Sequence, residues 1–477
     1  MRIFEKLGWY FLALLFILTL YICFYKLGAA YLDDWDEAWY GEMAKQIIKT
    51  GEFIVLRWNG EYLFDKPPLY IWITTLFALL FGLTEFSIRL TSAISGLIII
   101  SLATWYIYKK WGLLPSIVGY CSLAFNDIFI WRVRSGNLDT LVTLFIFLSF
   151  FVMISQWKYK YFALGFLFVC IFLTKTSLVF FPLSVFTIHE LIYNYKNILK
   201  NLSGYFILLL IFVILVGSWL LLGKQKAGQE FFTYYLFRSD QGVTDIDFSK
   251  FKWEYLKYTY YSLQRRFLFV MFLGTAAAVF LKWKKGSYFL MIVFSYALIF
   301  LLSFTMRNNN WYLMPSMPFW SLLIGYGTYF FINTVKRLKT PFSIAVLLLT
   351  IYVSYKTFIG HIIPIMYTSS STKQTQTALK AKSLSKPDET LVRMDHLYPS
   401  TIYYSDRHVL SSPSSTDGVL FISRVNVAKR IDQGKLQWLL GKKGDVESFV
   451  KEYNVSGKYI DVNDEEIIFQ AKKNNYL

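Results

Sequence analysis

Long apolar runs separated by short polar turns fill about the first three quarters of the chain. Most runs are near the length of about 20 residues that an α-helix needs to cross a bilayer. A shorter run at 69–83 is interpreted as an interfacial or re-entrant helix, because its crossing would place the pair Lys109 and Lys110 outside. The pattern predicts a polytopic α-helical membrane protein with about eleven spans. These lie at about residues 9–25, 87–108, 113–130, 139–156, 161–174, 177–194, 204–222, 266–281, 287–305, 314–332 and 342–360.

The composition agrees with a membrane protein. Of the 477 residues, 55% are hydrophobic and 20% aromatic, and the mean hydropathy is +0.41; a soluble protein of this length would be less apolar. The net charge of +18 fits basic cytoplasmic loops and anionic lipid headgroups. The sequence has no basic stripe on a soluble module, so a nucleic acid is not expected as a partner. The cysteines Cys23, Cys121 and Cys170 lie inside apolar runs and predict no disulfide framework.

Basic residues orient the predicted spans. Arg2 and Lys6 place the N-terminus in the cytoplasm, and the first run lacks a small-residue cleavage site, so we expect it to be a retained span. The later cytoplasmic turns are all basic and contain Lys158 and Lys160, Lys196 and Lys200, Lys282, Lys284 and Lys285, and Lys336, Arg337 and Lys339. The external segments are then 31–68, 131–140, 174–176, 223–266 and 306–318. Because their unusual polar residues converge on one membrane face, we expect a single site there.

The first external segment, residues 31–68, is a polar island with the sequence YLDDWDEAWYGEMAKQIIKTGEFIVLRWNGEYLFDKPP. From Asp36 onward, Trp39, Met43 and Ile47 recur on one side of a helix that Gly51 would end, and such a helix would lie along the membrane surface. Its charged residues are expected on other sides: Glu37, Glu42, Lys45 and Lys49. The acids at its start are either helix caps and solvated groups or include a general base, and they are Asp33, Asp34, Asp36 and Glu37.

The chain becomes polar and charged near residue 363. We predict short strands at ETLVRM, GVLFISR and GKYIDV, and helices at NVAKRIDQG and DVESFVKEY. The expected organisation is therefore a transmembrane domain over 1–362 and a small external α/β domain over 363–477.

Six motifs occur in order along the chain: DEAWYGEMA, WNGEYLFDKPPLYIW, FGLTEFSIRL, RSGNLDTLVTLF, LTKTS and WYLMPSMP. Over about residues 1–335 the chain resembles the GT-C glycosyltransferases related to the lipid A aminoarabinose transferases and the protein O-mannosyltransferases. The acidic loop followed by KPPL is the most specific of these signals. The resemblance implies that a sugar moves, with inversion, from a polyprenyl (undecaprenyl) phosphate to a lipid, glycan or protein acceptor. It places this reaction at the outer face of the bacterial cytoplasmic membrane.

The resemblance assigns roles to residues of the first external segment. Asp36 is the predicted base that deprotonates the acceptor hydroxyl, with Glu37 as the alternative. Lys66, held by the Pro67-Pro68 step, would contact the donor phosphate; the alternative is a surface lysine before a helix start. Tyr40 occupies a retained motif position and is expected to bind substrate.

Asp139 opens a predicted span and is either an N-cap or, as the resemblance implies, a carboxylate of the active-site cavity. Some relatives hold a divalent metal between this acid and one that matches Asp65. Two carboxylates with no histidine nearby in the sequence are a weak metal signal by themselves.

Further basic and aromatic residues could contact the donor. Lys175 lies between two apolar runs, where it would either snorkel to the surface or bind phosphate. Arg238 and Arg307 are candidates for phosphate pairing, and the Tyr312 hydroxyl could donate to phosphate or sugar, although tyrosine is also common at membrane interfaces. Trp39 stands where aminoarabinose-type relatives commonly carry an arginine, so the resemblance does not specify aminoarabinose as the sugar.

Two other classes of protein compete with the transferase. A flippase or transporter of polyprenyl-linked sugars would also need cations for a lipid phosphate, but would place ionisable groups near the bilayer midplane and often shows inverted repeats. A membrane scaffold would leave Lys175 and the block from Asp36 to Lys66 unexplained. The clustering of polar residues on one face favours the transferase.

Overall fold

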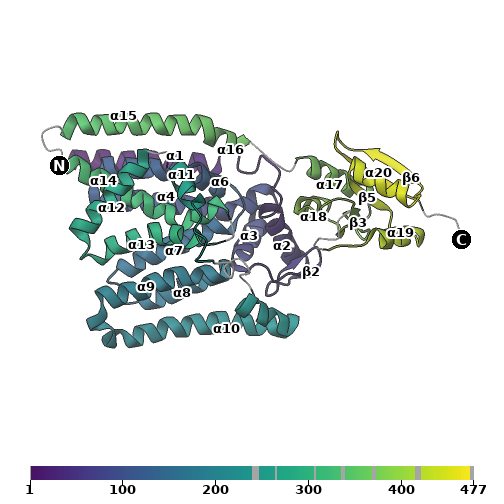
Figure 1. Ribbon diagram of the computed structural model, residues 1–477, viewed down its shortest axis with the longest axis horizontal. Coiled ribbons are helices and arrows are strands. Elements are labelled where there is room, and N and C mark those ends of the chain that lie inside the picture. The colour runs from purple at the N-terminus through teal and green to yellow at the C-terminus, as the bar shows by residue number, and fades with distance from the viewer. Residues whose placement is uncertain are drawn as a thin grey trace. The chain divides into compact units, whose positions relative to one another are not determined.

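The computed structural model describes residues 2–238, 247–263, 266–305, 308–334, 339–367, 372–413 and 420–472 (Figure 1). The first part of the chain forms the helices α1 (Arg2–Phe24), α2 (Glu37–Thr50), α3 (Leu69–Phe81), α4 (Glu85–Trp111), α5 (Leu113–Ala124), α6 (Asp127–Arg134), α7 (Leu138–Ile154), α8 (Lys160–Thr174), α9 (Phe180–Tyr193), α10 (Leu202–Thr233), α11 (Glu254–Ser262), α12 (Arg266–Lys282), α13 (Gly286–Leu302), α14 (Met317–Thr334), α15 (Lys339–Thr357) and α16 (Ile363–Tyr367). The last part forms α17 (Thr372–Leu384), α18 (Pro399–Ser405), α19 (Arg424–Asp432) and α20 (Lys443–Glu452).

Short strands and tight helical turns complete the described chain. The strands are β1 (Arg57–Trp58), β2 (Glu61–Tyr62), β3 (Leu391–Arg393), β4 (Val409–Ser411), β5 (Trp438–Lys442), β6 (Gly457–Asp461) and β7 (Glu466–Ala471). The 3-10 and π turns are η1 (Thr176–Val179), η2 (Tyr195–Asn197), η3 (Leu199–Asn201), η4 (Tyr234–Arg238), η5 (Asn310–Ser316) and η7 (Phe358–Ile362).

A helix lies at each predicted span, and α3 occupies the short run at 69–83. Within the described ranges, four stretches are long and apolar enough to cross a membrane, or up to six if each of two bent helix pairs is one span. The four are Glu85–Trp111, Thr176–Tyr193, Leu199–Phe237 and Thr340–Tyr367. Shorter apolar helices accompany them, such as Leu138–Ile154 and Lys160–Thr174. The chain is therefore a multi-pass membrane protein, whereas the predicted number of eleven crossings is not confirmed.

The predicted span at 113–130 is corrected to a broken helix. α5 ends at Ala124, and α6 begins at Asp127 after a bend of 64°. Asn126 starts the new helix, because its side-chain oxygen accepts a hydrogen bond from the Phe129 N–H at 3.0 Å. The segment 131–134, which we expected in a loop, is consequently the last turn of α6.

The segment 223–266 is also more helical than expected. α10 continues to Thr233, with a kink at Gly228, whose φ of 80° is readily adopted only by glycine. The π turn η4 follows directly, and α11 forms farther along the segment. The predicted long external segment is thus helical up to Arg238 and again over Glu254–Ser262, whereas the described residues 247–253 between them form turns and irregular backbone.

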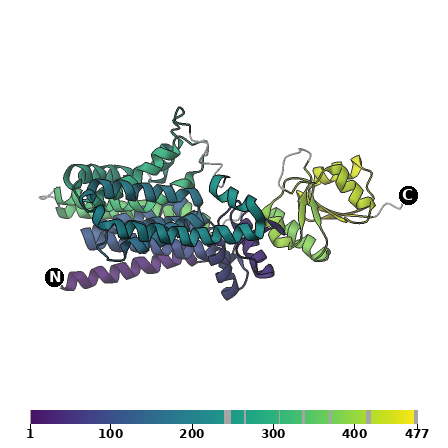
Figure 2. The same cartoon turned by 90° about the horizontal axis from the view of Figure 1, so that it is seen from below.

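Two compact units make up the chain. The first contains Met1–Leu27, Phe64–Ile73 and Arg89–Tyr367, and in it α8 lies alongside both α7 and α10 (Figure 1 and Figure 2). Helices α12 and α14 approach closely at Gly274 and Gly327. A Cβ atom added at Gly274 would lie 2.0 Å from the Leu323 carbonyl oxygen. Small residues at such a crossing allow two backbones to pack in direct contact.

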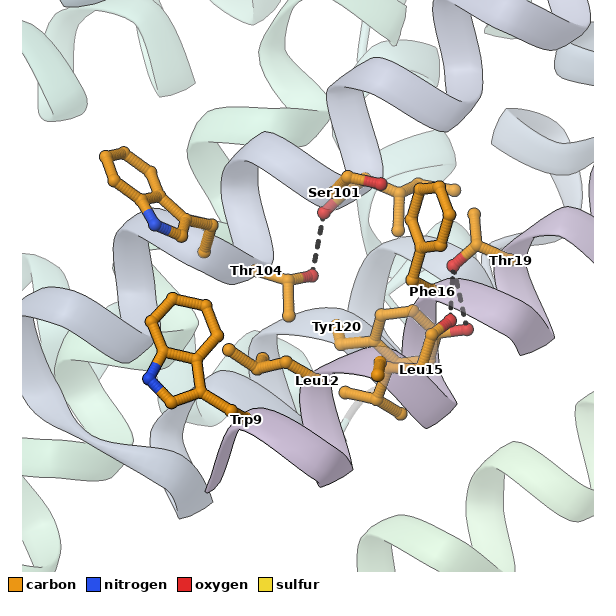
Figure 3. Close-up of a pocket in the computed structure, with 11 residues that line it drawn as sticks. Trp9, Leu12, Leu15, Phe16, Thr19, Ser101, Thr104 and Tyr120 are labelled. Carbon is orange, nitrogen blue, oxygen red and sulfur yellow. Dashed lines mark hydrogen bonds between the residues drawn. The ribbon is translucent and has the colours of Figure 1, made fainter. Parts of the chain in front are cut away.

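A cavity of about 290 Å³ lies between α1, α4 and α5 (Figure 3). Among the residues that line it, the Thr19 hydroxyl donates to the Tyr120 hydroxyl at 3.2 Å. None of the side chains that line the cavity is charged, and none of the predicted site residues is among them. The cavity is therefore separate from the charged residues considered below.

The second unit joins segments far apart in the sequence: Gly28–Leu63, Thr74–Ile88 and Thr368–Leu477. Its five-stranded mixed sheet has the order β4-β3-β5-β7-β6, with β3 parallel to β4 and β5, and β7 antiparallel to β5 and β6. Val392 pairs with Leu439 and Leu439 with Phe469, so these side chains share one face of the sheet. Val427 of α19 and Phe449 of α20 belong to the same apolar core.

The predicted elements of the C-terminal part are confirmed in part. ETLVRM and GKYIDV contain β3 and β6, and the two predicted helices overlap α19 and α20, each of which begins two residues earlier than predicted. GVLFISR is corrected, because its only described pairing is an isolated bridge from Phe421 to Ser411, and residues 414–419 lie outside the described chain. Strands β4, β5 and β7 were not predicted. The domain boundary at 362/363 stays a prediction. The second unit groups residues 28–63 with Thr368–Leu477, which we call the C-terminal segment.

The predicted helix of the first external segment is confirmed as α2. Gly51 ends it with φ 70°, and the Gly51 N–H donates to the Ile47 carbonyl. The expected distribution of charges is corrected, because Glu37, Glu42 and Lys45 are buried rather than solvated. The buried charges face α18 of the same unit, as described below.

Replacing Gly274 with valine is expected to destabilise the first unit. The added side chain would clash with the Leu323 carbonyl of α14, and overpacking typically costs roughly 1–3 kcal/mol. The midpoint of thermal unfolding of the purified protein in detergent should fall. Gly217→Val in α10 is the matched control, because no atom lies within 4 Å of a Cβ added there. Equal midpoints for the two variants would contradict the close contact of α12 and α14.

Candidate active site

A buried carboxylate connects the ends of three helices in the first unit. One oxygen of Asp139, near the start of α7, accepts from the Arg132 guanidinium of α6 at 2.6 Å. The other accepts from the Lys175 ammonium, just after α8, at 3.0 Å. The exposed fraction of the side chain is 4% for Arg132, 8% for Asp139 and 30% for Lys175. These three side chains together carry two positive charges and one negative charge, and Lys175 is the most exposed of the three.

Residues of the turn before α7 bring Arg132 and Asp139 together. Asn137 caps α7 by accepting from the Thr140 N–H at 3.1 Å, and its side-chain amide donates back to the Arg132 carbonyl. The Thr140 hydroxyl donates to the same carbonyl at 3.0 Å. Asn137 rather than Asp139 is therefore the N-cap, which leaves the Asp139 carboxylate to the two cations.

Lys175 occupies a break between α8 and η1. Its backbone is extended, with φ −155° and ψ 95°, while its N–H still donates to the Ile171 carbonyl at 2.8 Å. Because the helix ends at this residue, the side chain can reach Asp139 on the neighbouring helix α7. The LTKTS motif thus marks a helix break that positions an ammonium group.

Aromatic rings of η5 lie against both cations. The Lys175 ammonium lies 4.4 Å from the centre of the Tyr312 ring, and the Arg132 guanidinium lies 5.3 Å from that of Trp311. Cation–π contacts of this kind hold the charged groups in place without neutralising them. The structure therefore brings together three residues that the sequence predicted separately: Asp139, Lys175 and Tyr312.

Asp65 and Lys66 form a second charged pair in the same unit. Their side chains are 2.9 Å apart and partly exposed. The Tyr235 hydroxyl donates to the Lys66 carbonyl at 2.7 Å, and the Tyr234 hydroxyl lies 3.4 Å from Asp65. Since both tyrosines belong to η4, the extension of α10 fixes the backbone that carries Lys66.

Asp36 and Glu37 belong to the second unit, and the structure distinguishes them. Glu37 is buried and accepts from the Asp33 N–H at 2.8 Å, so it stabilises the turn before α2. Asp36 occupies the N-cap position of α2 without a capping hydrogen bond from its side chain, and its carboxylate accepts from the Tyr40 hydroxyl at 3.0 Å. The Asp36 side chain is half-buried. It is hydrogen-bonded to the Tyr40 hydroxyl rather than to a backbone N–H at the start of α2.

Trp39 is part of an aromatic cluster around this turn. Its ring centre lies 6.1 Å from that of Tyr40 in a stacked arrangement, 6.1 Å from Trp58 and 5.9 Å from Trp35. The position at which aminoarabinose-type relatives carry a cation is thus filled by an indole among other rings.

Asp34 and Asp406 of the second unit have shifted pKa values. Burial raises the pKa of the Asp34 carboxyl, and its hydrogen bonds with Ser400 and the charge of Arg393 offset only part of this rise. Burial also opposes ionisation of Asp406, but the hydrogen bond from Lys49 and the charge of Lys45 outweigh it and lower the Asp406 pKa. Asp406 therefore ionises readily beside two lysines, whereas ionisation of Asp34 is opposed by its surroundings.

Two predicted residues cannot be placed in the site. Arg307 lies outside the described residues, and Arg238 is the last residue of η4, with its side chain outside the described part. Arg132 was missed by the sequence analysis. The feature that could have revealed Arg132 is its place in WRVR, seven residues before Asp139. We expected this segment to be an external loop.

The arrangement of Asp139 does not fit a divalent metal between it and Asp65. Both oxygens of Asp139 accept from cations, and one oxygen of Asp65 lies 2.9 Å from the Lys66 ammonium. Within the described ranges, no group of three or more His, Cys, Asp or Glu side chains could hold a metal ion. We therefore derive no step through a metal.

Comparisons with known proteins extend these observations. The sequence model of the family described as dolichyl-phosphate-mannose-protein mannosyltransferase matches residues 65–221, a range that contains Lys66, Arg132, Asp139 and Lys175. An uncharacterised protein of Aquifex aeolicus (strain VF5) is 26% identical over 381 residues, which cover 75% of this chain and 72% of that protein. The undecaprenyl phosphate-alpha-4-amino-4-deoxy-L-arabinose arabinosyl transferase 1 of Proteus mirabilis (strain HI4320) is 28% identical over 237 residues, 46% of this chain and 40% of that protein.

A solved structure shares the fold over nearly the whole chain. ArnT from Cupriavidus metallidurans, bound to undecaprenyl phosphate, superposes with a TM-score of 0.78 over 98% of each chain, at 14% sequence identity. Together with the family match, this superposition confirms the resemblance to GT-C glycosyltransferases related to aminoarabinose and mannosyl transferases.

Replacing Asp139 with alanine is expected to lower the free energy of unfolding by roughly 3–5 kcal/mol, because two cations in a buried site lose their partner. Unfolding of the purified protein by denaturant measures the change. Adding Arg132→Met should restore part of the loss, since it removes one of the two cations that Asp139 had balanced. Asp247→Ala is the control, because the Asp247–Lys250 pair is exposed and such pairs contribute about 0–1 kcal/mol. Additive losses from Asp139→Ala and Arg132→Met would contradict the pairing.

Proposed function

We propose that this chain, which has the fold of the GT-C glycosyltransferases, moves a sugar from a polyprenyl phosphate carrier to a hydroxyl group of an acceptor. The observation that carries this proposal is the buried Asp139 with Arg132 and Lys175, a site with more positive than negative charge. A phosphate group suits such a site, because charge-assisted hydrogen bonds to phosphate are short and strong. The Cupriavidus metallidurans structure contains undecaprenyl phosphate, which supports a polyprenyl phosphate as the carrier.

The leaving group sets the first chemical requirement. When the bond between the anomeric carbon and the phosphate oxygen breaks, the carrier departs as a phosphate with an additional negative charge. Preorganised cations that stabilise this charge lower the barrier. We assign this role to Lys175 and Lys66, with Arg132 holding the site together through Asp139. Arg238 and Arg307 stay candidates for further phosphate contacts, and Tyr40 and Tyr312 for contacts with the phosphate or sugar.

The acceptor sets the second requirement, a base. The acceptor oxygen forms its bond to the anomeric carbon from the face opposite the phosphate, so the configuration inverts. Its proton passes to a carboxylate as the bond forms. We assign this role to Asp36, since Glu37 is buried and accepts from a backbone N–H. The Tyr40 hydroxyl at 3.0 Å orients the Asp36 carboxylate.

The expected setting is the outer face of a bacterial cytoplasmic membrane. A lipid, glycan or protein each supplies a suitable hydroxyl as acceptor. Trp39 in place of the usual arginine leaves the donor sugar open, so aminoarabinose is not assumed. The proposed steps use the residues above and no divalent metal, because Asp139 and Asp65 are paired with cations.

Asp36→Asn is expected to abolish transfer, because the amide keeps the shape of the side chain but cannot accept the proton. The gene is deleted in its host and complemented with wild type or Asp36→Asn at equal protein levels. Mass spectrometry then measures polyprenyl phosphate sugars and surface glycoconjugates. One carrier-linked sugar should accumulate, and one glycoconjugate should lose that sugar, in both the deletion and the variant strain.

A control for this experiment is Asp247→Asn, which changes an exposed acid outside the proposed machinery and should restore the wild-type profile. If Asp36→Asn also restores the wild-type profile, Asp36 is not the base, and the flippase or transporter interpretation gains support.

Lys175→Met is expected to weaken use of the donor, because the side chain keeps its length but loses its charge. Hydrogen bonds to charged groups are worth about 1.5–3 kcal/mol, so kcat/KM for the donor should fall roughly 10- to 100-fold. The control is Lys250→Met, which removes an exposed lysine. Unchanged kcat/KM for Lys175→Met, at a normal protein level, would remove Lys175 from the phosphate site.

A further inference from the structure

The turn that carries Asp36 has an unusual backbone. Trp35 has φ 49° and Asp36 has φ 36°, two consecutive residues with side chains in a region that favours glycine. Non-glycine residues persist there only when the surrounding structure over-determines their conformation. Contacts that hold this turn are therefore contacts that determine where the Asp36 carboxylate points.

Helix α18 of the C-terminal segment holds the chain just before this turn. The Tyr404 hydroxyl accepts from the Leu32 N–H at 2.8 Å and donates to Glu85, the first residue of α4, at 2.9 Å. The Ser400 N–H donates to the Asp34 carboxylate at 2.8 Å. One tyrosine hydroxyl thus joins three segments of the second unit, and a backbone amide of the same helix holds the residue two positions before Asp36.

The same part of the C-terminal segment holds the helix after the turn. Lys45 of α2 is buried, donates to the Tyr403 carbonyl and lies 3.3 Å from Asp406. Lys49, one helical turn later, lies 2.5 Å from the same Asp406 carboxylate. These contacts explain why α2 buries charged residues that an isolated amphipathic helix would expose.

A third contact connects the β1–β2 turn to the edge of the sheet. The Asn59 side-chain amide donates to the Val409 carbonyl at 2.8 Å and accepts from the Val409 N–H at 3.0 Å. Since β4 is the edge strand, the Asn59 side chain takes the place of a neighbouring strand at this position. Residues on both sides of the Asp36 turn are therefore fixed to the C-terminal segment.

Apolar packing reinforces these polar contacts. Leu32 and Ala38 share one buried cluster with Ile88, Tyr403 and Tyr404. A Cβ atom added at Gly41 would lie 2.8 Å from Ile88 and 3.1 Å from the Tyr403 ring, so glycine is required for this close approach. The glycine of DEAWYGE thus serves the packing of α2 within this unit.

We infer that the C-terminal segment is the scaffold that holds the Asp36 turn in its strained conformation, and that Tyr404 is its central positioning residue. This inference rests on the proposed role of Asp36 as the base. It assigns the C-terminal segment a part in the chemical step, through geometry, without contact between Tyr404 and the substrate. A base displaced by a small distance transfers a proton poorly, even when every group of the site is present.

Tyr404→Phe tests the inference with the smallest change, because it removes only the hydroxyl that joins Leu32 to Glu85. In the complemented deletion strain, the amount of modified glycoconjugate should fall roughly 5- to 20-fold, the effect of one lost hydrogen bond on the reacting geometry. Hydrogen–deuterium exchange of the purified full chain should increase at residues 32–40. Binding of undecaprenyl phosphate, measured as the shift it causes in the unfolding temperature, should stay at the wild-type value.

Two variants serve as controls. Tyr459→Phe removes a hydroxyl from an exposed tyrosine of β6 in the same unit and should leave transfer and exchange unchanged. Glu85→Gln keeps an oxygen that accepts from Tyr404 and should retain most of the transfer, whereas Glu85→Leu should resemble Tyr404→Phe. A role in folding alone would not produce this ranking at unchanged carrier binding.

Transfer at the wild-type level in Tyr404→Phe would overturn the inference. So would a loss of transfer accompanied by a similar loss of undecaprenyl phosphate binding and a lower unfolding temperature, because the change would then concern the fold as a whole. These outcomes differ from failure of the proposed function: if Asp36→Asn is inactive and Tyr404→Phe is fully active, only the inference fails. If Asp36→Asn is active, the base assignment fails whatever Tyr404→Phe shows.

Discussion

The pairing of Asp139 with Arg132 and Lys175 is the constraint on which the first unit depends. A carboxylate removed from water must be paired and hydrogen-bonded, since an isolated buried charge is strongly unfavourable. This requirement accounts for the cap at Asn137, the helix break at Lys175 and the last turn of α6, which together place the three groups within 3.0 Å contacts. The same three side chains carry the role that we propose for the phosphate site, so one set of interactions links the fold to the proposed chemistry.

The second unit meets a different constraint, a strained turn in a polar segment. Residues 28–63 form a short segment, and a segment of this length by itself buries too little surface to offset the conformational entropy of ordering its chain. Contacts with residues 350 or more positions away, such as Leu32 with Tyr404, supply the further burial and hydrogen bonds. The C-terminal segment is therefore part of the structure that presents Asp36, in addition to any contact it makes with an acceptor.

Hydropathy predicted the helices well, because burial in an apolar medium acts on every residue of a run. It failed at 113–134, where the apolar run continues through Asn126 and only a side-chain cap marks the end of one helix and the start of the next. It also failed for β4, which has three residues and forms by pairing with β3. Strand pairs of that kind depend on partners distant in the sequence, so no local pattern identifies them.

The sequence by itself determined that this is a membrane protein, the approximate positions of its helices, and Lys175 as a charged residue between two apolar runs. Asp139 and Tyr312 were found through motifs that resemble those of a known family. The tertiary structure alone decided the partners. Arg132 was hidden in a segment expected to be a loop, and Tyr404 had no motif. Composition and periodicity report what each residue prefers, whereas hydrogen bonds and ion pairs depend on distances of about 3 Å that only the folded chain creates.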